Sequence, residues 1–283
     1  MVFPATLGLA VFVLLPFLCS ILMSFTDLSL GSPYEIQWVG WTQYERLAAD
    51  PAVARALRNN LLFAAVIVPT QTGLALALAC LVHKPGWRFA GFYRGLFFAP
   101  VVLPMSLVCV IWRRLFEAGR TGPFNQLLSL VSLGQWQARD FLHDPQLALG
   151  AVSLLSLWQG VGLQMVLLLA GLQQIPQALY EASALDGASP LQQFRRITLP
   201  LLRNTLIFTA LMTTILAFRV FDQVQILTHG GPAGATSTLM FEIVRSAYER
   251  LQMGRACALT VVLISIVLGL SILQKSVLRR NSP

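Results

Sequence analysis

Six long apolar runs dominate this sequence and limit most strongly what the chain can fold into. A helix that spans the hydrocarbon core of a bilayer needs roughly 20 predominantly apolar residues, and each run is long enough to cross with some tilt. Only 11% of the 283 residues are charged, whereas 56% are hydrophobic, which is unlike a soluble domain. We therefore predict an all-α integral membrane protein with about six transmembrane helices, forming a single transmembrane domain over residues 1–283. The runs cover residues 2–25, 60–82, 95–116, 148–172, 204–225 and 256–277.

The first run could in principle be a cleaved signal peptide. Its apolar part is longer than the h-region of a typical signal peptide, and no basic residues precede it. We expect a retained membrane helix. The missing basic flank also leaves open that the natural chain begins upstream of Met1.

Basic residues are distributed unevenly among the connectors. Cytoplasmic loops of membrane proteins carry an excess of Lys and Arg. The connectors 83–94 and 173–203 and the C-terminal tail carry several basic residues, whereas acidic residues interleave with arginine in the connectors 26–59, 117–147 and 226–255. This bias predicts that the first group and both termini are cytoplasmic. It also explains the net charge of +8 without nucleic-acid binding, since no basic patch with stacking aromatic residues is present. The basic residues of the first group are Lys84, Arg88, Arg94, Arg195, Arg196, Arg203, Lys275, Arg279 and Arg280.

Several kinds of chemistry lack the residues that they need. Neither lysine lies in a glycine-rich phosphate-binding loop, so we expect no ATPase activity on this chain. The three histidines lie in connectors without metal-ligand spacing, which predicts no metal site. The cysteines each fall inside an apolar run, where we expect them to be small buried hydrophobic residues. They are Cys19, Cys80, Cys109 and Cys257.

The connector 173–203 has the pattern of two short helices joined by a tight turn. Residues 177–186 are good helix formers, and Gly187 permits a turn with positive φ. Ser189 followed by Pro190 is typical of a helix start. Pro200 is expected to end this second helix before the chain re-enters the membrane. The segment would present small and apolar side chains to a partner.

The same connector resembles the EAA loop of binding-protein-dependent ABC permeases. The family pattern is E-A-A, three residues, G, nine residues, I, one residue and L-P, and every spacing is met here; a serine replaces the second alanine. In this family the first short helix docks into a cleft on the ATPase subunit. The resemblance therefore implies that residues 176–203 form a coupling loop. The residues implied are Glu181, Ala182, Ser183, Asp186, Gly187, Ile197, Leu199 and Pro200.

A second pattern resembles the carbohydrate-uptake branch of this family, in particular the first permease subunit of maltose and glycerol-phosphate importers. It has the form F-D followed by T-x-G-G-P and T, and the resemblance places it on the external side. Without the family, the Gly-Gly-Pro run is only a turn signal. The residues of this external signature are Phe221, Asp222, Thr228, Gly230, Gly231, Pro232 and Thr236.

These resemblances imply a transport subunit and its partners. The chain would form half of the translocation pathway for a sugar, glycoside or related polyol, in the cytoplasmic (inner) membrane of a bacterium or archaeon. The partners implied are a second homologous permease subunit, a dimer of ATP-binding cassette subunits, an extracytoplasmic solute-binding protein and membrane lipid, with no nucleic acid. The chain itself would need no cofactor, because ATP and Mg²⁺ would bind to the ATPase subunits.

Polar residues within the spans are candidates for the pathway, because they are costly in lipid and usually face the interior of a bundle. In the fourth span they recur every three residues, and in the fifth every four. Neutral hydroxyl and amide groups beside an aromatic ring suit a sugar or polyol. Alternatively, Ser and Thr side chains bond to their own helix or hold neighbouring helices together. The candidates are Ser153, Ser156, Trp158, Gln159, Gln164, Thr205, Thr209 and Thr213.

A secondary, ion-coupled transporter is the alternative transport hypothesis. It predicts an ionisable residue near the middle of a span, but the middles of the spans contain no Asp, Glu or Lys. Arg219 and Asp222 lie near one end of the fifth span, and the sequence does not assign them a role.

Overall fold

The computed structural model describes residues 3–31, 35–83 and 88–280, with side chains up to residue 276. Lys84 of the predicted cytoplasmic connector lies outside the described residues. Within the described part the secondary structure is helical, apart from two isolated β-bridges. The elements are α1 (Phe3–Leu9), the π-helical turn η1 (Ala10–Leu14), α2 (Leu15–Met23), α3 (Thr42–Ala49), α4 (Pro51–Val82), α5 (Ala90–Val102), α6 (Met105–Leu115), α7 (Pro123–Val131), α8 (Ala148–Leu172), α9 (Gln177–Leu185), α10 (Pro190–Gln193), the π-helical turns η2 (Phe194–Thr198) and η3 (Arg245–Glu249), α11 (Leu199–Phe218), α12 (Asp222–Leu227), α13 (Leu239–Val244) and α14 (Met253–Arg280).

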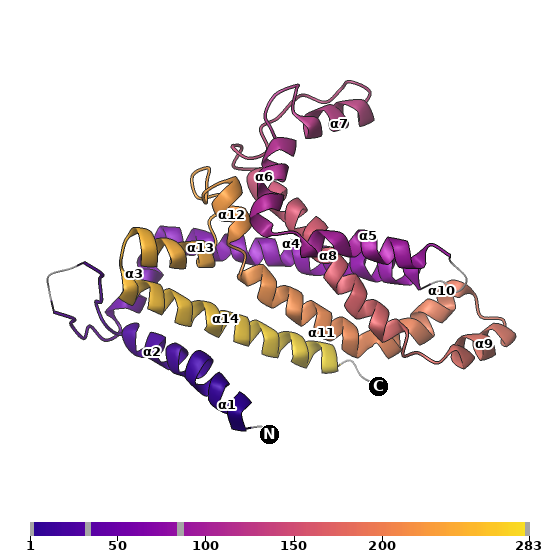
Figure 1. The fold of residues 1–283 in the computed structure, drawn as a ribbon, viewed down its shortest axis with the longest axis horizontal. Helices are drawn as coiled ribbons and strands as arrows, with labels where there is room; N and C mark the ends of the chain where they lie inside the picture. Colours follow the sequence, from indigo (N-terminus) through magenta and orange to yellow (C-terminus); the bar gives the residue numbers. More distant parts are fainter. Residues whose placement is uncertain (1–2, 32–34, 84–87, 281–283) are drawn as a thin grey trace.

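Five described helices are long and apolar enough to cross a membrane, and a bent pair brings the number to six. This confirms the predicted fold class. The fourth run coincides with α8, and α14 contains the sixth. The first run forms α1, η1 and α2, which bury no side chains and diverge from the other helices (Figure 1). Cys19 on α2 is consequently exposed, so the prediction that it is buried was wrong.

The third run is not one straight helix. It forms α5 and α6, whose axes differ in direction by 97°. Pro104 restricts the residue before it to extended conformations, and Leu103 has φ −72° and ψ 136°. The helix therefore breaks at Leu103. Figure 1 shows α6 and α7 projecting away from the bundle.

The fifth run also differs from its prediction at both ends. The helix begins at Pro190 and passes without interruption through α10, η2 and α11, so Pro200 does not end it. Proline lacks an N–H and its ring collides with the carbonyl four residues earlier in a regular α-helix. The π-helical turn before Pro200, with a bond from Leu199 N to Phe194 O, relieves this conflict. At the other end the helix stops at Phe218, and α12 is separate.

The pair α4 and α8 forms the centre of the bundle, with α5 packed against α8 and α11 packed mainly against α4 (Figure 1). Alanines of α4 face α8 in one buried cluster, together with Met165 and Leu168. A second cluster lies nearer the other end of α4 and includes Phe63, Leu155 and Phe218. Glycine on α8 allows this helix to lie close to α5. A methyl group at Gly162 would overlap the backbone oxygen of Phe97 on α5.

We expect Gly162→Ala to lower the free energy of unfolding by about 1–3 kcal/mol, because the backbone of α5 cannot move aside locally. Gly150→Ala on the same helix is the matched control, since its added methyl group meets no atom within 4 Å. Alanine is the better helix former, so this control should retain or gain stability. Thermal unfolding in detergent measures both variants. Equal shifts would contradict the packing described for Gly162.

An ion pair fixes the start of α4, just outside the span. Asp50 caps the helix by accepting a hydrogen bond from Ala52 N (2.7 Å) and pairs with Arg255 of α14. Burial raises the pKa of Asp50, but the hydrogen bonds from Ala52 and Arg255 outweigh it, so that the pKa lies below its ordinary value of 3.8. Because the folded pKa is lowered, this carboxylate stabilises the fold above pH 3.8, and the stabilisation is lost as the pH falls through the lowered pKa.

Asp50→Asn is expected to lower the free energy of unfolding at neutral pH by about 1–2 kcal/mol, since Arg255 loses its partner in a partly buried place. Asparagine still caps the helix. The difference from the unmodified protein should narrow as the pH is taken below 3.8. Thermal unfolding at several pH values tests this, with Glu45→Gln on the exposed side of α3 as control. A difference that is constant with pH would contradict the assignment.

Candidate functional site

The connector 173–203 begins with the predicted short helix α9 and a tight turn. Gly187 has φ +77°, and the backbone bonds Gly187 N to Ala184 O (3.0 Å) and Ala188 N to Ser183 O (2.9 Å) close the end of α9 as a Schellman motif. The next helix starts with a capping box, in which Ser189 Oγ accepts from Gln192 N and Gln192 Oε1 accepts from Ser189 N. The sequence therefore predicted α9, the turn and the start of the second helix correctly, but not where the second helix ends.

Most residues of the EAA pattern on α9 are exposed. Glu181, Ala182 and Asp186 face solvent, and Gly187 lies in the exposed turn. Ser183 is only partly exposed, because its hydroxyl points towards α10. The remaining residues of the pattern lie where α10 continues into α11, namely Ile197, Leu199 and Pro200. The protein thus offers a short exposed helix with small side chains at one end of the bundle (Figure 1).

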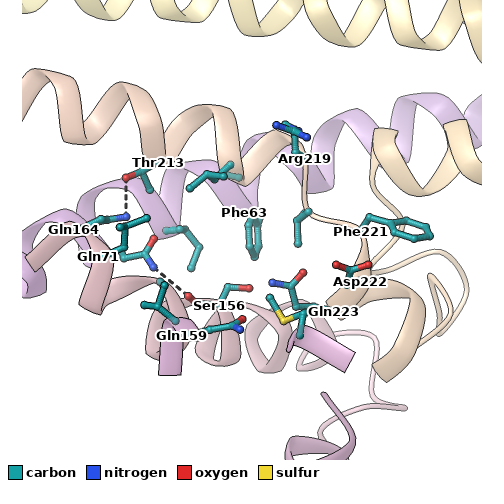
Figure 2. A pocket seen from close by; sticks show the side chains of 18 residues that line it. Phe63, Gln71, Ser156, Gln159, Gln164, Thr213, Arg219, Phe221, Asp222 and Gln223 are labelled. Carbon is teal, nitrogen blue, oxygen red and sulfur yellow. Dashed lines mark hydrogen bonds between the residues drawn. The ribbon is translucent and has the colours of Figure 1, made fainter. Parts of the chain in front are cut away.

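A cavity of about 410 Å³ lies between α4, α8 and α11 and extends to both broken spans. Val101 and Met105, on either side of the α5–α6 bend, line it, and so do residues 219–223, which run from the end of α11 into the start of α12. In transporters, irregular backbone at membrane depth occurs where it lines a cavity, and discontinuous helices commonly form the solute site. Figure 2 shows polar side chains converging on this space from several helices.

Four glutamines line the cavity, and the amide N–H groups of three of them donate hydrogen bonds to the protein itself. Gln164 Nε2 donates to Thr213 Oγ1 (2.7 Å), and Gln71 Nε2 donates to Ser156 O (3.0 Å), as Figure 2 shows. Gln159 Nε2 donates to a backbone carbonyl of the α5–α6 link (3.4 Å). The amide oxygens of Gln159 and Gln164 are buried and accept no hydrogen bond within the described structure. These two oxygens belong to side chains that line the cavity, but the atoms themselves lie beneath its surface.

Charged and aromatic groups line the end of the cavity that lies near α12. Arg219 and Asp222 both contribute, and no ion pair joins these two side chains. Phe63 extends into the space, while the ring of Phe221 points away from it (Figure 2). The lining is thus mainly neutral, with one side chain of each charge.

The structure separates the predicted pathway residues into two groups. Ser156, Gln159, Gln164 and Thr213 line the cavity. The other four lie elsewhere, and Trp158 packs against Trp112 with ring centroids 5.7 Å apart. Several hydroxyls bond to carbonyls one turn earlier on their own helices, which is the alternative that the sequence left open. The four residues outside the cavity are Ser153, Trp158, Thr205 and Thr209. The hydroxyls that donate to carbonyls of their own helices belong to Ser153, Ser156, Thr209 and Thr213.

The Gly-Gly-Pro signature forms a fixed turn at the end of the bundle opposite α9. Thr228 and Thr236 share a hydrogen bond (2.7 Å), and Thr236 Oγ1 donates to Gly231 O (2.8 Å). The turn is attached to α4 through Asn59, whose Nδ2 donates to Gly234 O (2.9 Å). Its Gly231–Pro232 peptide bond is cis. Hydrogen bonds within the turn therefore hold Thr228, Gly231 and Thr236 of the signature, and Gly230 and Pro232 lie in the same turn. Phe221 and Asp222 instead line the cavity.

Sequence reasoning missed part of the cavity lining. Gln71 is the one glutamine inside the second span, and the cost of its amide in lipid was a signal that could have been used. Gln223 follows the Phe-Asp pair, but only the break after Phe218 brings it into the cavity. Among the described residues, no group of three or more His, Cys, Asp or Glu side chains could hold a metal ion.

Comparison with known proteins identifies the family. Residues 71–282 match the family described as the binding-protein-dependent transport system inner membrane component. The chain belongs to this family. The permease is 37% identical to the probable ABC transporter permease protein YurN of Bacillus subtilis over 93% of this chain and 89% of that protein. It is 32% identical to the trehalose/maltose transport system permease protein MalF of Thermococcus litoralis, over 96% and 90% of the two chains.

The fold of the permease agrees with this assignment. It superimposes on a chain of the bacterial alginate ABC transporter, crystallised with its alginate pentasaccharide-bound periplasmic protein, with a TM-score of 0.85 at 19% identity. The match covers 99% of the permease and 93% of that chain. This protein is thus the multi-pass permease subunit of an ABC importer in the inner membrane, and it is a transport subunit and not an enzyme.

Proposed function

We propose that this permease forms one half of an ATP-driven import pathway for a neutral sugar, glycoside or related polyol. The observation that carries the proposal is the mainly neutral, polar lining of the cavity between α4, α8 and α11. Of the relatives described above, one is named for trehalose and maltose and another for alginate. The class of solute proposed here rests on the cavity itself.

The hydrogen-bonding capacity of the cavity suits a ligand rich in hydroxyl groups. Glutamine, serine and threonine side chains contribute amide and hydroxyl groups to its lining. A hydroxyl donates one hydrogen bond and accepts others, so a polyhydroxylated solute can pair with both kinds of group. An ionised phosphate or carboxylate offers only acceptors, and the lining contributes a single cation, Arg219, together with the carboxylate of Asp222.

The size and the apolar part of the cavity also fit this class. Its volume of about 410 Å³ lies within the range of roughly 300–1,000 Å³ that is usual for small-molecule sites. Phe63 offers a ring face to the apolar side of a sugar (Figure 2). The cavity is open, which supports a second homologous permease subunit as its other wall.

The energy would come from partner subunits. A dimer of ATP-binding cassette subunits, with ATP and Mg²⁺, would dock on α9 through Glu181, Ala182 and Gly187. The loop 173–203 and both chain termini would lie in the cytoplasm, and a solute-binding protein would deliver the solute from outside. Closure of the ATPase pair would then move the α9 helices of the two permeases together and open the cavity outwards.

Competition for uptake tests the proposed class of solute. Cells that produce the complete transporter are given a labelled neutral disaccharide or glycoside that they take up, with an excess of unlabelled neutral glycoside, polyol or sugar phosphate. We expect the neutral compounds to compete and the sugar phosphates not to. Competition by sugar phosphates alone would contradict a neutral pathway.

A further inference from the structure

Four side chains connect α9 to the helix that becomes α11, and we call them the α9 brace. Gln193 Nε2 donates to Tyr180 O (3.2 Å) and to Ser183 Oγ (3.0 Å). The hydroxyl of Tyr180 shares a hydrogen bond with Thr198 Oγ1 (2.9 Å). Ser183 Oγ in turn donates to Tyr180 O (2.9 Å). The brace therefore consists of Tyr180, Ser183, Gln193 and Thr198.

The brace spans the one π-helical turn in this part of the described chain. Gln193 is the last residue of α10, and Thr198 is the last residue of η2. Tyr180 bonds to both, with its backbone oxygen and its hydroxyl respectively. A π-helical turn replaces regular α-helical bonds and is a common place for a helix to bend. A bond on each side of η2 therefore restrains this bend.

Apolar packing gives α9 little other support. Within the described residues α9 buries no side chain. A cavity of about 670 Å³ separates it from the end of α4, and Tyr180, Gln193 and Thr198 line this cavity. Thr198 is buried, while the other three brace residues are partly buried, so these hydrogen bonds are only partly shielded from water.

We propose that the brace makes α9 and α11 move as one body, with Gln193 as its central positioning residue. The proposal rests on the proposed function, in which an ATPase moves α9. Because η2 could otherwise bend, displacement of α9 would be absorbed before it reached the cavity-lining part of α11. Ser183 thereby gains a role, since its hydroxyl accepts a brace bond that alanine could not accept.

The experiment compares the assembled transporter in proteoliposomes with variants of the brace. Gln193→Ala removes both amide bonds, and Tyr180→Phe removes the bond to Thr198 while keeping the ring. Each is expected to lower the number of solute molecules taken up per ATP hydrolysed by about fivefold, with the ATPase still bound. Gln192→Ala is the matched control, since this neighbouring amide bonds to Ser189 and not to α9. It should leave the ratio unchanged.

Two further measurements separate the brace from a loss of folding. Ser183→Thr keeps the hydroxyl and should behave like the unmodified protein, whereas Ser183→Ala combined with Gln193→Ala should be no worse than Gln193→Ala alone.

Spin labels at the exposed positions Leu179 on α9 and Leu201 on α11 should give a narrow distance distribution that broadens in Gln193→Ala. An unchanged transport ratio, or an unchanged distribution, in Gln193→Ala would overturn the proposal. If the unmodified transporter failed to use ATP, the proposed function would fall instead, and the label distances would still test the brace.

Discussion

Gly187→Val is expected to lower ATP-driven uptake by about tenfold or more, while the protein still inserts in the membrane. Gly187 has φ +77° and ends α9 with a Schellman motif. A β-branched side chain strongly disfavours this conformation, so the turn would reorganise and α9 would leave its position. No atom lies within 4 Å of the added Cβ, so the effect comes from the backbone and not from a clash.

Gly187→Asn is the matched control for this prediction. Asparagine adopts the left-handed region more readily than other residues with a side chain, so it should retain most of the uptake. Uptake and ATP hydrolysis are measured on the same proteoliposomes. Normal uptake by Gly187→Val would show that the turn does not couple α9 to transport.

The second large effect is expected from Gln164→Leu in the cavity. This change removes an amide of the cavity lining and its bond to Thr213, and it places an apolar side chain where the proposed solute meets a polar group. We expect uptake to fall by about tenfold or more, because the unpaired hydroxyl of the solute costs more than 1 kcal/mol. Transport of labelled solute at several concentrations measures the change.

Ser153→Ala is the control for the cavity. Its hydroxyl bonds to Leu149 O (2.7 Å) on its own helix, and it lies outside the cavity. Uptake by this variant should match the unmodified protein, although the sequence placed Ser153 and Gln164 in the same group. Equal losses in the two variants would mean that the cavity is not the pathway.

The spans and the α9 turn were predictable because they depend on local properties. Apolar runs of sufficient length specify helices in lipid, and α8 has the residues of its predicted span. Gly187 and Ser189 have intrinsic preferences that act within a few residues, so the turn and the capping box followed directly.

The breaks in the third and fifth spans were not predictable by the same argument. Proline is tolerated in membrane helices when neighbouring groups compensate, so its position alone does not decide the outcome. Pro104 breaks the third span, whereas Pro200 lies in a continuous helix because η2 precedes it. Whether a proline breaks a membrane helix therefore depends on whether its surroundings can replace the backbone hydrogen bond that it removes.

Only part of the cavity lining could be foreseen for a related reason. Periodicity places polar residues on one face of a helix, but the packing of three helices decides which of them meet. Gln71 joins the cavity because Gly160 on α8 leaves room for its amide. Thr205 and Thr209 share the periodicity of Thr213, and yet only Thr213 lies at the depth of the cavity.

Purification of the permease in detergent, followed by transport in proteoliposomes, tests its function as an ABC importer subunit most directly. We expect an ATPase and a second permease to co-purify with the chain, and uptake to require ATP and the solute-binding protein. Glu181→Lys, on the exposed face of α9, should release the ATPase. If the chain instead purifies alone and moves solute in liposomes on an ion gradient without ATP, the protein is a secondary transporter.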